Sequence, residues 1–209
     1  MSLRIPLTVQ RCPGAAKGKV RFCEAGKCLI AEQVVLRRWR ARSQTARARG
    51  RGETFDGCRL PPNTWNLVLD CRHHGLSERD LVNPDALQAA IAAARVRHPT
   101  WRAPHAAKLA PLLRFLLGRR VLTAVLERER DAANPGLPDL FLWRRTPERP
   151  VHGGRFVEVK RRLLRPAWRE RLSLAQRAEL QFLRSLGLKA GVVYLIETGA
   201  RTSPGSPQA

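Results

Sequence analysis

The fold of this chain is set by Gly136-Leu137-Pro138-Asp139-Leu140, together with Phe156-Val157-Glu158-Val159-Lys160 further along the sequence. Side chains alternate between the two faces of a strand, so Glu158 and Lys160 share one face while the valines point to the other. If the two stretches pair as neighbouring strands, Asp139 is carried to the same place. Two carboxylates and one ammonium group would then meet at one sheet edge.

The last third of the chain has the pattern of strand, strand, helix, strand. Apolar runs predict strands at residues 140–143, 156–160 and 192–196. Ser173 is expected to open the helix, because Gln176 follows it at the spacing of a capping box, and Gly187 stands where a helix ends. A helix in this position brings the last strand into the same sheet. The sequence therefore predicts an α/β fold.

The first two thirds are expected to be mostly helical and basic. Apolar periodicity predicts helices over 31–39, from residue 85 onward and over 108–130, with Gly118 as a candidate break. Residues 65–71 form an apolar strand or helix. The run 40–52 has almost nothing to bury, which favours a mobile basic loop.

The charge balance points to a polyanionic partner. Lys and Arg number 39 against 17 Asp and Glu, a formal net charge of +22. GC-rich coding explains the preference for Arg over Lys but not the scarcity of acids, so nucleic acid is the expected partner. No apolar run approaches the ~20 residues of a membrane helix, and the N-terminus has no secretory signal. We expect no membrane partner and a cytoplasmic or nucleoid location, or a nuclear one in a eukaryote.

The two acids and the lysine suit phosphodiester hydrolysis. Asp139 and Glu158 would bind Mg²⁺ or Mn²⁺, because hard divalent cations prefer oxygen ligands. The backbone carbonyl of Val159 is a further candidate ligand, and Lys160 would hold the attacking water or the scissile phosphate. The alternatives are that Asp139 caps a turn after Pro138, and that Glu158 and Lys160 are only a surface pair.

These residues, with Arg171-Leu172-Ser173-Leu174-Ala175-Gln176-Arg177, resemble the VRR-NUC domain of the PD-(D/E)xK nuclease superfamily, found in Fanconi-associated nucleases and bacterial relatives. The resemblance is firm over 128–196. It implies a restriction-endonuclease-like core, a small mixed sheet flanked by helices. It also places the catalytic acids at Asp139 and Glu158, the lysine at Lys160 and an accessory glutamine at Gln176.

The chain departs from the family pattern in two places. Family members carry a further metal-binding acid upstream, and here the matching text is Arg51-Gly52-Glu53-Thr54-Phe55, with the acid displaced. Either Glu53 takes that role through a shifted loop, or the third ligand is missing. After the lysine, a long basic segment replaces a short turn, which indicates either a DNA-binding loop or an inactive member. Its candidate DNA-binding residues are Arg161, Arg162, Arg165, Arg169 and Arg171.

The resemblance divides the chain into an irregular extension (1–30), a nuclease domain (31–198, best supported over 128–198) and a disordered tail (199–209). The function it implies is metal-dependent hydrolysis of DNA phosphodiester bonds, on branched or flapped DNA in repair. The rivals are a catalytically inactive nucleic-acid-binding protein on the same fold, and an RNA-structural basic protein.

The cysteines leave two interpretations open. Zinc ligands could come from a set that also includes two histidines: Cys12, Cys23, Cys28, Cys58, Cys71, His73 and His74. The spacings are irregular and no Cys-x-x-Cys pair exists, so small buried thiols are the favoured interpretation.

Overall fold

A computed structural model describes residues 4–12, 20–24, 26–102, 104–131, 137–164 and 167–198 of the 209-residue chain. Its strands are β1 (Arg4–Arg11), β2 (Phe22–Glu24), β3 (Lys27–Leu29), β4 (Thr54–Arg59), β5 (Leu140–Arg145), β6 (His152–Leu163), β7 (Trp168–Arg169) and β8 (Lys189–Glu197). Its helices are α1 (Ala31–Ala48), α2 (Thr64–His73), α3 (Glu78–Leu81), α4 (Pro84–Arg97), α5 (Ala106–Gly118), α6 (Leu122–Asp131) and α7 (Leu174–Ser185).

The strands form one mixed sheet in the order β3-β2-β1-β8-β6-β5-β4, with β7 paired to β6. Neighbours β4, β5 and β6 are antiparallel, whereas β8 runs parallel to both β6 and β1. A parallel pair needs a crossover, and α7 provides it between β6 and β8. The predicted strand, strand, helix, strand order and the mixed sheet are therefore confirmed.

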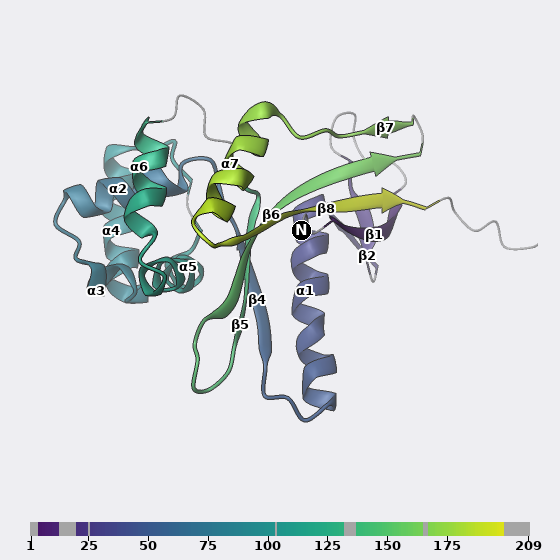
Figure 1. Ribbon diagram of the computed structural model, residues 1–209, viewed down its shortest axis with the longest axis horizontal. Coiled ribbons are helices and arrows are strands. Elements are labelled where there is room, and N and C mark those ends of the chain that lie inside the picture. Colours follow the sequence, from purple (N-terminus) through teal and green to yellow (C-terminus); the bar gives the residue numbers. More distant parts are fainter. Residues whose placement is uncertain are drawn as a thin grey trace, which may run out of the picture.

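Helices cover both faces of the sheet (Figure 1). Helix α1 lies along one face, where its apolar side packs on Leu142, Val157 and Val193. The other face carries α7 and the group α2–α6, whose larger core includes Phe141 and Phe156. Successive residues of β6 thus enter different cores, as strand alternation requires. No helix in the described residues is long and apolar enough to cross a membrane.

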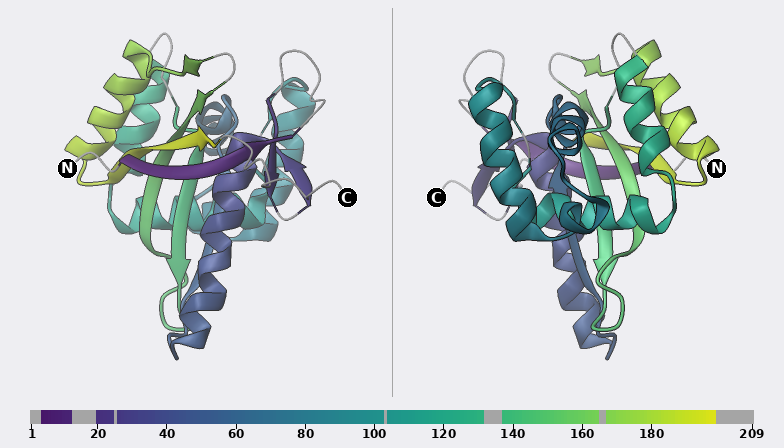
Figure 2. Two further views of the ribbon diagram at one scale, coloured as in Figure 1. Left: turned by 90° about the vertical axis from the view of Figure 1, so that its right-hand side faces the viewer. Right: turned by 90° about the vertical axis from the view of Figure 1, so that its left-hand side faces the viewer.

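The N-terminal strand corrects the expected irregular extension over residues 1–30. In the described residues of this segment, β1 pairs in parallel with β8 from Arg4 to Val9, and β2 and β3 form a hairpin beside it. Figure 2 shows β1 running alongside β8. Pro6 indicated a break, but it lies where β1 pairs only with β8 among the described strands, and an edge position tolerates proline.

The basic run 40–52 is also different from the mobile loop that we expected, because α1 continues through Ala48. The second half of the helix packs on β4 through small residues that a hydrophobicity pattern overlooks. Ser43 is buried, and its Oγ accepts a hydrogen bond of 2.8 Å from the backbone N–H of Phe55. The guanidinium of Arg42 lies 5.2 Å from the Phe55 ring.

The helical region does not simply precede the sheet. Helices α2–α6 are inserted between β4 and β5, and the ambiguous segment 65–71 belongs to α2. The expected break is real, because α5 ends at Gly118 and Arg120 takes the left-handed conformation with φ of 56°. The expected disordered tail, 199–209, lies outside the described residues.

A pair of acids lies where α6 faces α7. Glu129 is 8% exposed and Glu179 is 3% exposed. Burial, and then the charge of Glu179, raise the pKa of Glu129 from 4.5 to about 7. Burial also raises the pKa of Glu179, against the opposing effect of Arg128, whose Nε lies 3.8 Å from a Glu179 oxygen. At a pH between 4.5 and about 7, Glu129 of the folded protein therefore holds a proton that it has lost in the unfolded chain.

We predict that Glu129→Gln stabilises the protein at pH 8 by about 1–3 kcal/mol and has little effect near pH 4. An acid whose folded pKa is raised costs stability as pH rises from its unfolded value to its folded value, here from 4.5 to about 7. Urea unfolding at several pH values measures this, with exposed Glu127→Gln as the control. An equal change in the free energy of unfolding at pH 4 and pH 8 in Glu129→Gln would contradict the prediction.

Candidate active site

Asp139 is placed by the point at which β5 begins. The last β5–β6 pair at this end is Leu140 with Val157, so the N–H of Val159, two residues further along β6, lacks a β5 backbone partner. The side chain of Asp139 takes that place, and its Oδ2 accepts a hydrogen bond of 2.7 Å from the Val159 N–H. The N–H and C=O of one strand residue point the same way, so the Val159 carbonyl faces this edge too.

Glu158 and Lys160 share the face of β6 that carries α7. Nζ of Lys160 lies 2.8 Å from Oε1 of Glu158, and the two residues are 4% and 2% exposed. Gln176, in the first turn of α7, donates from Nε2 to the same Glu158 oxygen at 2.6 Å. Its Oε1 accepts from the backbone N–H of Ser173, so one residue serves both the capping box and the site.

Both acids bind a proton more tightly than free carboxylic acids do. Burial, and then the charge of Glu158, raise the pKa of Asp139 from 3.8 to about 7. Burial also raises the pKa of Glu158, although hydrogen bonds from Lys160 and Asp139 oppose the shift. Two carboxyl groups that share a hydrogen bond in a half-buried place compete with each other for ionisation. A cation bound between them would remove this cost.

Two further acids lie near this cluster. The charge of Glu32, at the start of α1, raises the pKa of Asp139. Glu170 lies 4.0 Å from Lys160 and binds Arg161 at 3.1 Å. Neither was proposed from the sequence. Glu32 could have been found, because it stands in the first turn of the predicted helix 31–39, whereas Glu170 depends on the β6–β7 pairing.

The structure does not bring Glu53 to the cluster. This corrects the alternative in which Glu53 supplies the third metal ligand. Glu53 precedes β4, and Arg59 at the other end of β4 is the residue opposite Leu140. Five residues of extended strand, about 17 Å, separate the two ends. Glu53 instead binds Arg144 at 3.1 Å, beside the β5–β6 turn. Among the acids of this part of the chain, Glu32 is the one whose charge raises the pKa of Asp139.

The arginines after β6 have mixed environments. Arg162 and Arg169 face each other across the β6–β7 pair and are exposed, as is Arg171. The guanidinium of Arg169 lies 5.4 Å from the Tyr194 ring. Arg161 is ion-paired with Glu170, and Arg165 lies outside the described residues.

A mixed sheet that holds two acids and a lysine where neighbouring strands separate defines the restriction-endonuclease-like class, the PD-(D/E)xK fold. Within it, this chain belongs to the VRR-NUC domain family, whose model matches residues 83–195, more than half of the chain. No curated protein sequence matches the chain.

Two solved structures are similar in fold. One is a crystal structure of paFAN1 bound to DNA with a 2-nucleotide 5′ flap and a gap; it is 18% identical, with a TM-score of 0.50. The match covers 94% of this chain and 38% of that one. The other is paFAN1 bound to DNA with a 1-nucleotide 5′ flap and a gap, at 18% identity, TM-score 0.47 and coverages of 95% and 39%. The chain thus spans about two fifths of the length of the structures that it matches.

We predict that Asp139→Asn makes the metal-free protein more stable at pH 8, by about 1–3 kcal/mol, and abolishes stabilisation by Mn²⁺. Asparagine keeps an acceptor for the Val159 N–H and removes the charge that repels Glu158. Thermal unfolding in chelator and in Mn²⁺ measures both effects. Glu53→Gln is the matched control and should respond to Mn²⁺ as the wild type does. If Mn²⁺ stabilised Asp139→Asn as much as the wild type, the prediction that Asp139 binds the metal would be contradicted.

Proposed function

We propose that the chain is a metal-dependent nuclease that hydrolyses DNA phosphodiester bonds. One observation supports this above the others: Asp139 and Glu158 are held close enough to share a hydrogen bond, with an ammonium group against them. A buried acid beside a half-buried one, both with raised pKa values, is costly for stability, and such groups gather at functional sites. Membership of the VRR-NUC family supports the same reaction.

The residues present fit a hard divalent cation. The donors are two carboxylates and, by strand geometry, the carbonyl of Val159, with Glu32 as a fourth oxygen donor close by. Oxygen ligands of this kind suit Mg²⁺ or Mn²⁺. When bound, such an ion supplies Lewis acidity and a water molecule of lowered pKa. Glu53 is not part of this proposal.

Lys160 and Gln176 would position the reacting groups and stabilise the charge that develops in the reaction. Lys160 would hold the attacking water or an oxygen of the scissile phosphate, because its ammonium group is fixed by Glu158 at 2.8 Å and by the sheet. Gln176 holds Glu158 from the other side, and the start of α7 fixes Gln176 through Ser173. Fixed donors around developing charge are worth more than mobile ones, because they need no reorganisation during the reaction.

The proposed substrate is branched or flapped DNA, in the context of repair. One structure that is similar in fold, paFAN1, is bound to DNA with a 5′ flap, and we extend that substrate class to this chain. The net charge of +22 supports a nucleic-acid partner, and exposed arginines lie beside the site on β6 and β7. Contacts of this kind bind phosphates and do not read base sequence.

We predict that the wild type cleaves 5′-flap DNA with Mg²⁺ or Mn²⁺ and is inactive in chelator. Glu158→Gln and Lys160→Met should lower the single-turnover rate by about 100-fold or more, because each removes a charge from the reacting centre. Both variants should keep the wild-type affinity for the same flap DNA. Gel-based cleavage and fluorescence anisotropy measure the two quantities.

Matched controls come from residues of the same type away from the cluster. Lys189→Met and Glu53→Gln should cleave at the wild-type rate, whereas Glu32→Gln should be slower. Tight binding without cleavage under any divalent metal would overturn the proposal in favour of an inactive nucleic-acid-binding protein. Preference for structured RNA, unaffected by Glu158→Gln, would favour the RNA-structural alternative.

We also predict that Arg162→Ala with Arg169→Ala weakens binding to every DNA sequence alike. The two lost phosphate contacts should reduce the slope of log affinity against log salt by about 1–2. Anisotropy titrations between about 50 and 200 mM salt measure the slope. Exposed Arg79→Ala, on α3, is the control. An unchanged slope in the double variant would remove this surface from the DNA interface.

A further inference from the structure

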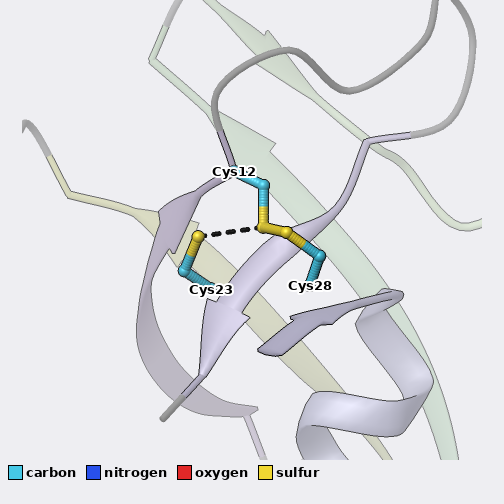
Figure 3. Close-up of side chains that lie close together, drawn as sticks. All are labelled: Cys12, Cys23 and Cys28. Atoms are coloured by element: carbon cyan, nitrogen blue, oxygen red, sulfur yellow. Dashed lines mark hydrogen bonds between the residues drawn. A yellow bond between two sulfur atoms is a disulfide. The ribbon is translucent and has the colours of Figure 1, made fainter. Parts of the chain in front are cut away.

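Three cysteines from three different segments meet at one point beside the sheet. Cys12 directly follows β1, Cys23 lies in β2 and Cys28 lies in β3 (Figure 3). A disulfide joins Cys12 to Cys28, and the Cys23 thiol lies 2.9 Å from the Cys12 sulfur. The three sulfur atoms all lie within 4.8 Å of one another. The cysteines have no regular spacing in the sequence, because the β1–β2–β3 pairing makes the contact.

A disulfide alone does not account for this arrangement. It uses two sulfurs and gives the third, that of Cys23, no role, although β2 carries that sulfur to the same point. The remaining cysteines of the described chain, Cys58 and Cys71, are buried in the other core, next to the helices α2–α6. The cluster is therefore a separate feature of the N-terminal strands.

We propose that, in the thiol form in which the chain is synthesised, Cys12, Cys23 and Cys28 bind one Zn²⁺ as thiolates. Three S–H bonds lose their protons to solvent and three Zn–S bonds form, so no electron is transferred. Zinc binds thiolate ligands well, whereas magnesium and calcium prefer oxygen ligands. The disulfide form excludes this site, because it withholds two of the three ligands.

The geometry suits the ion. Tetrahedral zinc with bonds of about 2.3 Å places its sulfur ligands roughly 3.8 Å apart, within the observed spread. No further Cys, His, Asp or Glu of the described residues joins the cluster, and the undescribed ranges contain none of these residue types. Glu24, on the same hairpin, is held by Arg38 at 2.8 Å. Water is thus the fourth ligand.

The site would fasten a part of the fold with little core of its own. Strands β2 and β3 have three residues each, and an isolated hairpin is marginal in water. Phe22 is its buried anchor, and a metal would add a cross-link between both strands and the end of β1. Cys28 stands four residues before Glu32, so the same cross-link holds the start of α1 beside Asp139.

The test is metal content and the spectrum of a cobalt-substituted protein, both prepared under a dithiol reductant. Wild type should carry about one Zn²⁺ per chain, and Co²⁺ should give a thiolate-to-metal charge-transfer band in the near ultraviolet. Cys23→Ser should lose both signals, whereas Cys71→Ala, the control, should keep both. The spectrum identifies sulfur ligation, so zinc held by Asp139 and Glu158 would not be mistaken for it.

A second measurement does not depend on a variant. Titration of the wild type with an organomercurial should release one Zn²⁺ as three thiols react. The proposal is overturned by any of three results: no zinc and no charge-transfer band in the reduced wild type, retention of both by Cys23→Ser, or mercurial reaction without zinc release. Retention by Cys23→Ser would place the metal on sulfur ligands other than Cys23, and either of the other two results would leave the three cysteines as a cluster that binds no zinc.

Discussion

The candidate site depends on one hydrogen bond, from the Val159 N–H to the carboxylate of Asp139. It forms because β5 begins at Leu140, two residues after the position opposite Val159, which leaves a backbone donor for a side chain to satisfy. The bond turns Asp139 toward Glu158 and fixes two carboxyl groups within reach of each other. Everything proposed for the chemistry follows from this separation of two paired strands.

The cost of that arrangement is visible in the electrostatics. Burial raises the pKa of both acids, and the charge of Glu158 helps to raise that of Asp139 to about 7. Lys160 and Gln176 reduce the cost at Glu158 by donating to the same oxygen. A fold under selection for stability alone would replace such a cluster, whereas a site that binds a cation gains from it. The arrangement is therefore consistent with the proposed metal site and unfavourable as structural support alone.

Sequence reasoning succeeded where the signal was local. Alternation along β6 placed Glu158 and Lys160 on one face, and the capping-box spacing placed Gln176 at the start of α7. It failed where long-range pairing decides the outcome. Glu53 lies in the stretch that matches the upstream acid of the family pattern, but the antiparallel register of β4 and β5 carries it to the end of β4 away from Asp139. The parallel pairing of β1 with β8, which joins the two ends of the chain, has no local signal at all.

The most direct test of the central claim is anomalous diffraction at the manganese edge from crystals grown with Mn²⁺. The account predicts a peak between the carboxylates of Asp139 and Glu158, about 2.2 Å from an oxygen of each, next to the Val159 carbonyl. A peak at Glu53, or a saturated crystal without a peak beside Asp139, would contradict it.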